Sequence, residues 1–228
     1  MSSRQEQMAH QGDREAQQRG PESPSIPSQP GAADGQDDVL QLAVQHHQGG
    51  RLAEAAGLYR LVIENDPSNA EAFRLLGLLH FHQGDNASAR QLVEQVIEMA
   101  PQNATAHADL GNVFASTGDA ESALESYQRA ATIAPEAPEI LAVMGQHLRN
   151  MGRAQDALEP LETAAELAPQ SAEVLTTLAT VLQETGDLDG AVKNYRRALS
   201  IKPDLAAAHA NLGLALFHLE DLDGAIEH

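Results

Sequence analysis

Apolar and small residues recur along this chain at a fixed spacing of 34 positions. Four series share the spacing: prolines, glycines, alanines, and leucines with one methionine. Their members are Pro67, Pro101, Pro135, Pro169 and Pro203; Gly50, Gly84, Gly118, Gly152 and Gly186; Ala55, Ala89, Ala123, Ala157, Ala191 and Ala225; and Leu42, Leu76, Leu110, Met144, Leu178 and Leu212. Such a period indicates a stacked repeat array, because each unit has an apolar face that only its neighbour can cover.

Each unit is predicted to contain two helices, as residues 104–137 illustrate. Apolar residues at helical spacing form two runs, first Leu110, Val113 and Phe114, then Ala123, Leu124, Tyr127 and Ala130. Gly118 and Asp119 separate the runs, and Pro135 ends the second. Glycine accepts the left-handed backbone that ends a helix, and the aspartate after it can cap the next helix. Asp85, Asp187 and Asp221 repeat the position of Asp119.

The alanine series predicts a close approach of the two helices within each unit. A larger side chain there should force the helices apart, at a cost of about 1 to 3 kcal/mol. Pro160 falls inside a second helix, where it removes an amide hydrogen bond, so we expect a kink.

The chain divides near residue 36. Residues 1–35 are rich in Gln, Ser, Gly and Pro and nearly lack branched aliphatic residues, which predicts a disordered tail. Five full units follow at 36–69, 70–103, 104–137, 138–171 and 172–205, with a partial sixth at 206–228. The sixth unit stops within its second helix, with Ala225 and Ile226 uncovered and no polar cap, so we expect the chain to be a fragment of a longer protein.

The units resemble the tetratricopeptide repeat (TPR) family. Its pattern is matched by Phe73, Leu76, Gly77, His80, Ala89, Val93 and Pro101, and by Leu110, Gly111, Phe114, Ala123, Tyr127, Ala130 and Pro135. Ala43 and Ala179 depart from it by replacing a glycine, and Glu220 replaces the glycine of the turn. The resemblance implies an all-α, right-handed superhelical solenoid of helix-turn-helix repeats.

Composition narrows the classes of function. The chain has 33 acidic and 14 basic residues, a net charge of -19 and a pI near 4.7, and -17 of this charge falls on residues 36–228. Nucleic acid and anionic lipid would be repelled, whereas a basic partner would associate faster at low salt. There is no cysteine, no apolar stretch near the roughly 20 residues that span a bilayer, and no secretory signal at the start. We therefore expect a cytoplasmic protein without membrane insertion.

Catalytic, cofactor and metal sites are not expected. The chain lacks a Gly-x-Ser-x-Gly elbow, a phosphate loop and a His-Glu-x-x-His motif. Its ten histidines include the pairs His46 with His47 and His80 with His82. Neither pair has the spacing of three or four positions that would place two ligands on one helix face, so packing roles are predicted.

The TPR resemblance implies that first helices line a concave groove and that their second, fifth, sixth, ninth, twelfth and thirteenth positions face a bound peptide. The groove candidates are His47, Glu71, Arg74, His82, Asp109, Asn112, Gln146, Arg149, Thr177, Thr180, Gln183 and Asn211, with Glu139 and His218 at equivalent positions. Their mixed polarity suits hydrogen bonds to a peptide segment.

Two ligand-binding patterns of the family do not fit these positions. The carboxylate clamp needs basic and amide residues in adjoining units, and Arg74 is followed by Asp109. The asparagine ladder of glycosyltransferase arms would place Asn at the sixth position of each unit. Among these positions only Asn211 matches.

The sequence therefore predicts a noncatalytic scaffold that binds a partner protein or peptide in the groove. An alternative is the N-terminal TPR arm of a larger enzyme, either a glycosyltransferase related to the O-linked N-acetylglucosamine transferases or a sulfotransferase, as in some bacterial proteins. A third hypothesis is self-association, in which the uncapped C-terminal end stacks on another copy.

Overall fold

The computed structural model of the protein describes residues 34–221 and residue 224. The helical repeats from residue 39 onward belong to one compact unit. The described residues form helices and no strands, which confirms the predicted all-α class. The helices are α2 (Asp34–Gln48), α3 (Leu52–Asn65), α4 (Ala70–His82), α5 (Asn86–Met99), α6 (Ala104–Thr117), α7 (Ala120–Ile133), α8 (Pro138–Asn150), α9 (Ala154–Leu167), α10 (Ala172–Thr185), α11 (Leu188–Ile201) and α12 (Ala206–His218).

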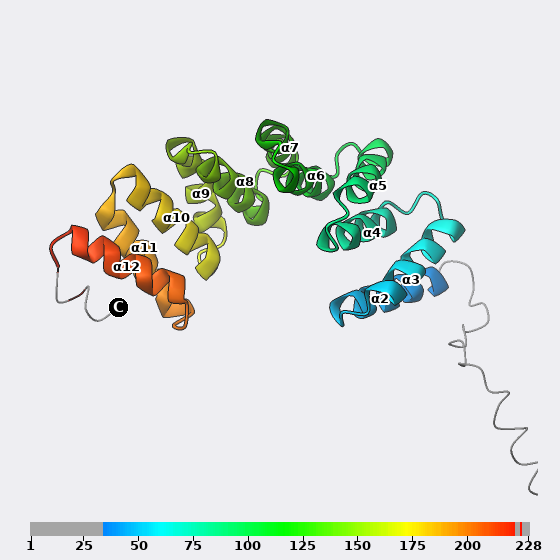
Figure 1. Ribbon diagram of the computed structural model, residues 1–228, viewed down its shortest axis with the longest axis horizontal. Helices are drawn as coiled ribbons and strands as arrows, with labels where there is room; N and C mark the ends of the chain where they lie inside the picture. Colours follow the sequence, from blue (N-terminus) through cyan, green and yellow to red (C-terminus); the bar gives the residue numbers. More distant parts are fainter. Residues whose placement is uncertain (1–33, 222–223, 225–228) are drawn as a thin grey trace, which may run out of the picture. The chain divides into compact units, whose positions relative to one another are not determined.

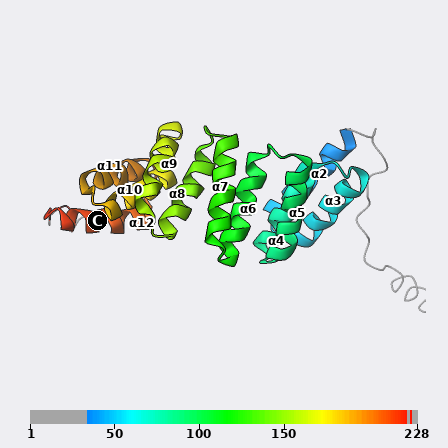
Figure 2. The same cartoon turned by 90° about the horizontal axis from the view of Figure 1, so that it is seen from above.

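Helices pair within each repeat, as the 34-residue period predicts. In Figures 1 and 2, α4 lies beside α5 and α6 beside α7, and the same pairing joins α8 to α9 and α10 to α11. Each second helix also contacts the first helix of the next repeat, so neighbouring pairs cover one another's apolar faces. The predicted helix-turn-helix repeats are therefore confirmed.

The turns follow the predicted chemistry. The carboxylates of Asp85 and Asp119 accept the backbone N–H of Ser88 and Ser122 at 3.1 and 3.2 Å, capping α5 and α7. Gly118, which ends α6, has a φ of 85°. Glu220 takes the same place in the last repeat with a φ of 63°, where glycine would avoid the steric cost of the left-handed region.

Small residues hold the two helices of each pair together. Ala55, Ala89, Ala123, Ala157 and Ala191 are each 0% exposed. On the opposing helix, Gly111 packs so closely on Tyr127 that a Cβ atom at Gly111 would lie 2.6 Å from the tyrosine ring. The pair α6 and α7 can adopt this spacing only because one contact surface lacks a side chain.

First helices also contact one another across repeats. Contacts join α4 to α6, α6 to α8, α8 to α10 and α10 to α12, whereas no second helix among the described residues makes the equivalent contact. We call the surface formed by the first helices of the repeats the first-helix face. It brings side chains from neighbouring repeats within reach of one another.

Three details differ from the sequence analysis or extend it. Helix α2 begins at Asp34, two residues before the predicted boundary at residue 36. The rest of the predicted disordered tail, residues 1–33, lies outside the described residues, and so do Ala225 and Ile226. Leu42, a member of the periodic leucine series, is 43% exposed, because no described helix precedes α2 to cover it. Helix α9 continues through Pro160, which is buried.

None of the helices in the part of the chain that the structure describes has the length and apolar character to cross a lipid bilayer.

The alanine series gives a direct test of the packing. Ala89→Leu places a large side chain in a contact that is 0% exposed, so we expect a loss of about 1 to 3 kcal/mol of stability. Ala87→Leu on the same helix is exposed and should change stability by less than about 0.5 kcal/mol. Urea unfolding followed by circular dichroism measures both, and equal midpoints for the two variants would contradict the packing.

Candidate functional site

Three buried tyrosines of the second helices direct their hydroxyls toward side chains of the first helices. Tyr59, Tyr127 and Tyr195 are at most 2% exposed and stand 68 positions apart, which is two repeats. The Tyr127 hydroxyl donates to Asn112 Oδ1 at 2.8 Å, and burial raises the pKa of Tyr127 to about 12, so the hydroxyl keeps its proton. These tyrosines, which belong to the second helices, therefore hold polar side chains of the first-helix face in place through their hydroxyls.

An ion cluster joins α4 to α6. Arg74 Nη2 lies 2.8 Å from Glu71 Oε1, and Arg74 Nη1 lies 3.1 Å from Asp109 Oδ2. The side chains of Arg74 and Asp109 are both 15% exposed. Burial raises the pKa of Asp109 above its ordinary value, although the Arg74 charge acts in the opposite direction. The hydrogen bond to Glu71 and the nearby carboxylates raise the pKa of Arg74, so its charge is fixed and already paired.

His47 and His82 meet on the same face from neighbouring repeats. Their ring centroids are 5.7 Å apart, and His47 Nδ1 lies 3.2 Å from the Tyr59 hydroxyl. Burial and the neighbouring His82 lower the pKa of His47. Within residues 34–221, no group of three His, Cys, Asp or Glu side chains is arranged to hold a metal ion.

A pocket of about 310 Å³ beside α8 and α10 has both apolar and amide side chains in its lining. Gln146 donates to Asn150 Oδ1 at 2.9 Å, and both line the pocket with Thr177. His147 is 8% exposed and lies with Nε2 2.8 Å from the carbonyl oxygen of Ala120, so it ties α8 to the preceding repeat.

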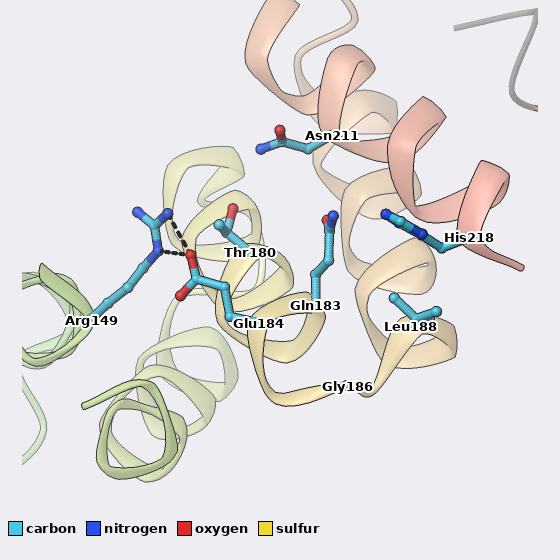
Figure 3. Close-up of a pocket in the computed structure, with 8 residues that line it drawn as sticks. All are labelled: Arg149, Thr180, Gln183, Glu184, Gly186, Leu188, Asn211 and His218. Carbon is cyan, nitrogen blue, oxygen red and sulfur yellow. Dashed lines mark hydrogen bonds and ion pairs between the residues drawn. The ribbon is translucent and has the colours of Figure 1, made fainter. Parts of the chain in front are cut away.

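A second and larger pocket, of about 490 Å³, lies between α8, α10 and α12. Figure 3 shows Thr180 and Gln183 on α10, Asn211 and His218 on α12, and the ion pair of Arg149 with Glu184 at one side. Arg149 Nη2 lies 2.7 Å from Glu184 Oε1. Beneath the pocket, the Tyr195 hydroxyl lies 3.1 Å from Thr180 Oγ1 and 3.2 Å from Gln183 Oε1.

The groove candidates therefore fall into local groups along the first-helix face. Arg149, Thr180, Gln183, Asn211 and the equivalent His218 line the larger pocket, and Gln146 and Thr177 line the smaller one. Asp109 and Asn112 border a small cavity beside α4 and α6, Glu71 and Arg74 pair with Asp109, and His47 contacts His82. Glu139 is exposed and lines none of these pockets.

The sequence reasoning missed the partners that hold these groups in place. Glu184 lies 35 positions after Arg149, as Asp109 lies 35 positions after Arg74, so opposite charges one position beyond a full repeat were the available signal. The spacing of 68 positions between the tyrosines was a second signal. No sequence signal pointed to the partner of His147, because that partner is a backbone carbonyl oxygen.

Family models match residues 40–220, and solved structures share the fold of the chain. A model described as tetratricopeptide repeat matches residues 40–94 and 74–138, another with the same description matches 114–181, and one described as TPR repeat matches 181–220. No curated protein matches the chain.

Three solved proteins illustrate the structural likeness. PilF of Pseudomonas aeruginosa is 20% identical with a TM-score of 0.78, covering 87% of this chain and 90% of its own. YrrB, described as a TPR protein with an unusual peptide-binding site, is 22% identical with a TM-score of 0.63, covering 74% and 87%. TTC0263 of Thermus thermophilus, a thermophilic TPR protein, is 21% identical with a TM-score of 0.65, covering 80% and 99%. At these identities the likeness shows the fold alone.

The ion cluster predicts a pH-dependent loss of stability. Arg74→Met leaves the Asp109 carboxyl without its cation, which raises a pKa that burial has already raised. A carboxyl with a raised folded-state pKa gives stability below its ordinary pKa and loses it as the pH rises through the folded value. We therefore expect Arg74→Met to cost about 1 to 3 kcal/mol at pH 7 and less near pH 4.

Urea midpoints of the variant and the unsubstituted chain at both pH values measure this difference. Arg153→Met is the control, because Arg153 and Asp156 form an exposed pair 2.7 Å apart and should contribute less than about 1 kcal/mol at either pH. An Arg74→Met effect of the same size at both pH values would contradict the role given to Asp109.

Proposed function

The chain belongs to the tetratricopeptide repeat family, and from this premise we propose that it is a noncatalytic scaffold that binds a segment of a partner protein along its first-helix face. One observation carries the proposal. Arg149, Thr180, Gln183 and Asn211 come from three first helices, were selected by their position in the repeat, and line a single pocket. A pocket assembled from successive repeats suits a polypeptide ligand, because an extended or helical segment can contact several helices at once.

Peptide binding by a related fold supports the same proposal. The description of YrrB gives that protein a peptide-binding site, and we extend peptide binding to this chain as part of the proposal. The partner's surface outside the groove is proposed to be basic, since residues 36–228 carry -17 of the net charge. A cytoplasmic location remains the prediction drawn from the sequence.

Selection of peptides from a random library against the full chain tests the proposal. Gln183→Ala and Asn211→Ala remove side chains that line the larger pocket, so selected peptides should bind these variants at least about tenfold more weakly. Lys193→Ala is the control, because Lys193 is exposed on α11 and lines neither the 490 Å³ nor the 310 Å³ pocket. Fluorescence anisotropy measures the affinities, and circular dichroism checks the fold.

Two results would oppose this function. A library that yields no binding peptide would contradict peptide recognition itself. Peptides that bind both groove variants as tightly as the unsubstituted chain would move recognition away from the larger pocket.

Self-association through α12 is a second proposal, favoured by the exposure of its apolar side chains. Phe217 is 57% exposed and Leu214 is 48% exposed. Light scattering should then show a mass that rises with concentration, and Phe217→Ser should reduce that rise. A constant monomer mass over the concentration range would refute the association.

A further inference from the structure

Charges in the larger pocket are already paired within the protein. Arg149 Nε and Nη2 lie 2.8 and 2.7 Å from the same oxygen of Glu184, as the dashed lines in Figure 3 show. A carboxylate of the ligand would compete with Glu184 for Arg149, and a cation of the ligand would compete with Arg149 for Glu184. Either ligand would lose hydration while replacing one ion pair by another, so it gains little from these charges.

Arg74, the other arginine among the groove candidates, is also held in ion pairs within the protein. Arg74 is held by Glu71 at 2.8 Å and by Asp109 at 3.1 Å. The twelve candidates contain two arginines and two carboxylates, so their formal charges cancel. The candidate residues are therefore neutral in sum, although the array as a whole is strongly acidic.

Uncharged polar groups remain available in the larger pocket. Thr180 donates its hydroxyl proton to the carbonyl oxygen of Thr176 at 2.9 Å, and the Tyr195 hydroxyl has one proton to share between Thr180 and Gln183. No hydrogen bond to another described residue uses the amide nitrogen of Gln183. Figure 3 shows Asn211 extending from α12 on the same side of the pocket as Thr180.

Amides at the pocket surface favour ligands that both donate and accept hydrogen bonds. Side chains of Asn, Gln, Ser and Thr supply both functions without a charge. A site that hydrogen-bonds such a group discriminates against ligands that leave its own polar groups unpaired.

The smaller pocket is more apolar, with Val143 and Val174 in its lining, but it also holds uncharged polar side chains. Gln146, Asn150 and Thr177 line it, and its one carboxylate, Glu173, lies 3.5 Å from Lys202. Uncharged polar side chains of α8 and α10 therefore occur in both pockets.

We propose that the segment bound at the larger pocket presents uncharged polar side chains, Asn, Gln, Ser or Thr, to Gln183 and Asn211. This inference rests on the proposed function, because it names the class of peptide that the scaffold binds. Basic residues of the partner that respond to the acidic surface lie outside this segment and affect the rate of association rather than the contacts in the pocket.

Three peptide pools of equal length test the inference on the full chain. The first pool varies among Asn, Gln, Ser, Thr and Gly. Every peptide of the second pool carries at least one Asp or Glu in addition, and every peptide of the third carries at least one Lys or Arg. We expect the tightest binders to come from the first pool. Replacement of a single Asn or Gln in such a peptide by Asp or Lys should weaken binding at least about tenfold.

Glu184→Gln provides the sharper test because it releases Arg149 with little change of shape. The variant should bind Asp-substituted peptides at least about tenfold more tightly than the unsubstituted chain does. Glu162→Gln is the matched control, since it makes the same change of net charge on the exposed side of α9 and should leave the preference unchanged.

The outcomes separate the two proposals. A preference of the unsubstituted chain for acidic or basic peptides, or an equal gain in Glu184→Gln and Glu162→Gln, would overturn the inference while leaving peptide binding intact. Binding from none of the pools, when a random library does yield binders, would also overturn the inference alone. Only the absence of binders from the random library as well would contradict the proposed function.

Discussion

The structure depends on the close contact between the two helices of each repeat. Alanines of the second helices, such as Ala89 and Ala123, are fully enclosed, and a Cβ atom at Gly111 would lie 2.6 Å from the ring of Tyr127. Because a larger side chain at these positions would separate the two helices, a small residue recurs there every 34 residues. Repeats built on this contact stack through their remaining apolar faces, which gives the array its order.

The close contact also prepares the first-helix face for binding. A tyrosine held beneath that face directs its hydroxyl outward, so Asn112 above Tyr127, and Thr180 and Gln183 above Tyr195, have defined positions before any ligand arrives. Fixed polar groups lower the ordering cost of association. Ion pairs between neighbouring repeats occupy Arg74 and Arg149 on the same face, which leaves hydrogen bonding as the proposed source of selectivity at the larger pocket.

Repeat length, turns and helix contacts could be predicted from the sequence because they depend on residues at fixed positions within one unit. Gly118, Asp119 and Ala123 each act through their own backbone or their own helix pair, and the structure places them as expected. Contacts between units were not predicted. Whether Arg149 reaches Glu184 depends on the rotation between successive helix pairs, which periodicity alone does not specify. The exposure of Leu42 likewise depends on what precedes α2 in space, although its place in the series resembles that of buried leucines.

Chemical-shift mapping of the isotope-labelled chain with a library-selected peptide tests the central claim most directly, because it reports contacts at every backbone amide without a substitution. The account predicts shifts concentrated on α8, α10 and α12 around Gln183 and Asn211, with the exposed surface of α9 and α11 unchanged. Shifts confined to the second helices would contradict it, since the groups that the buried tyrosines hold in place would then have no part in binding.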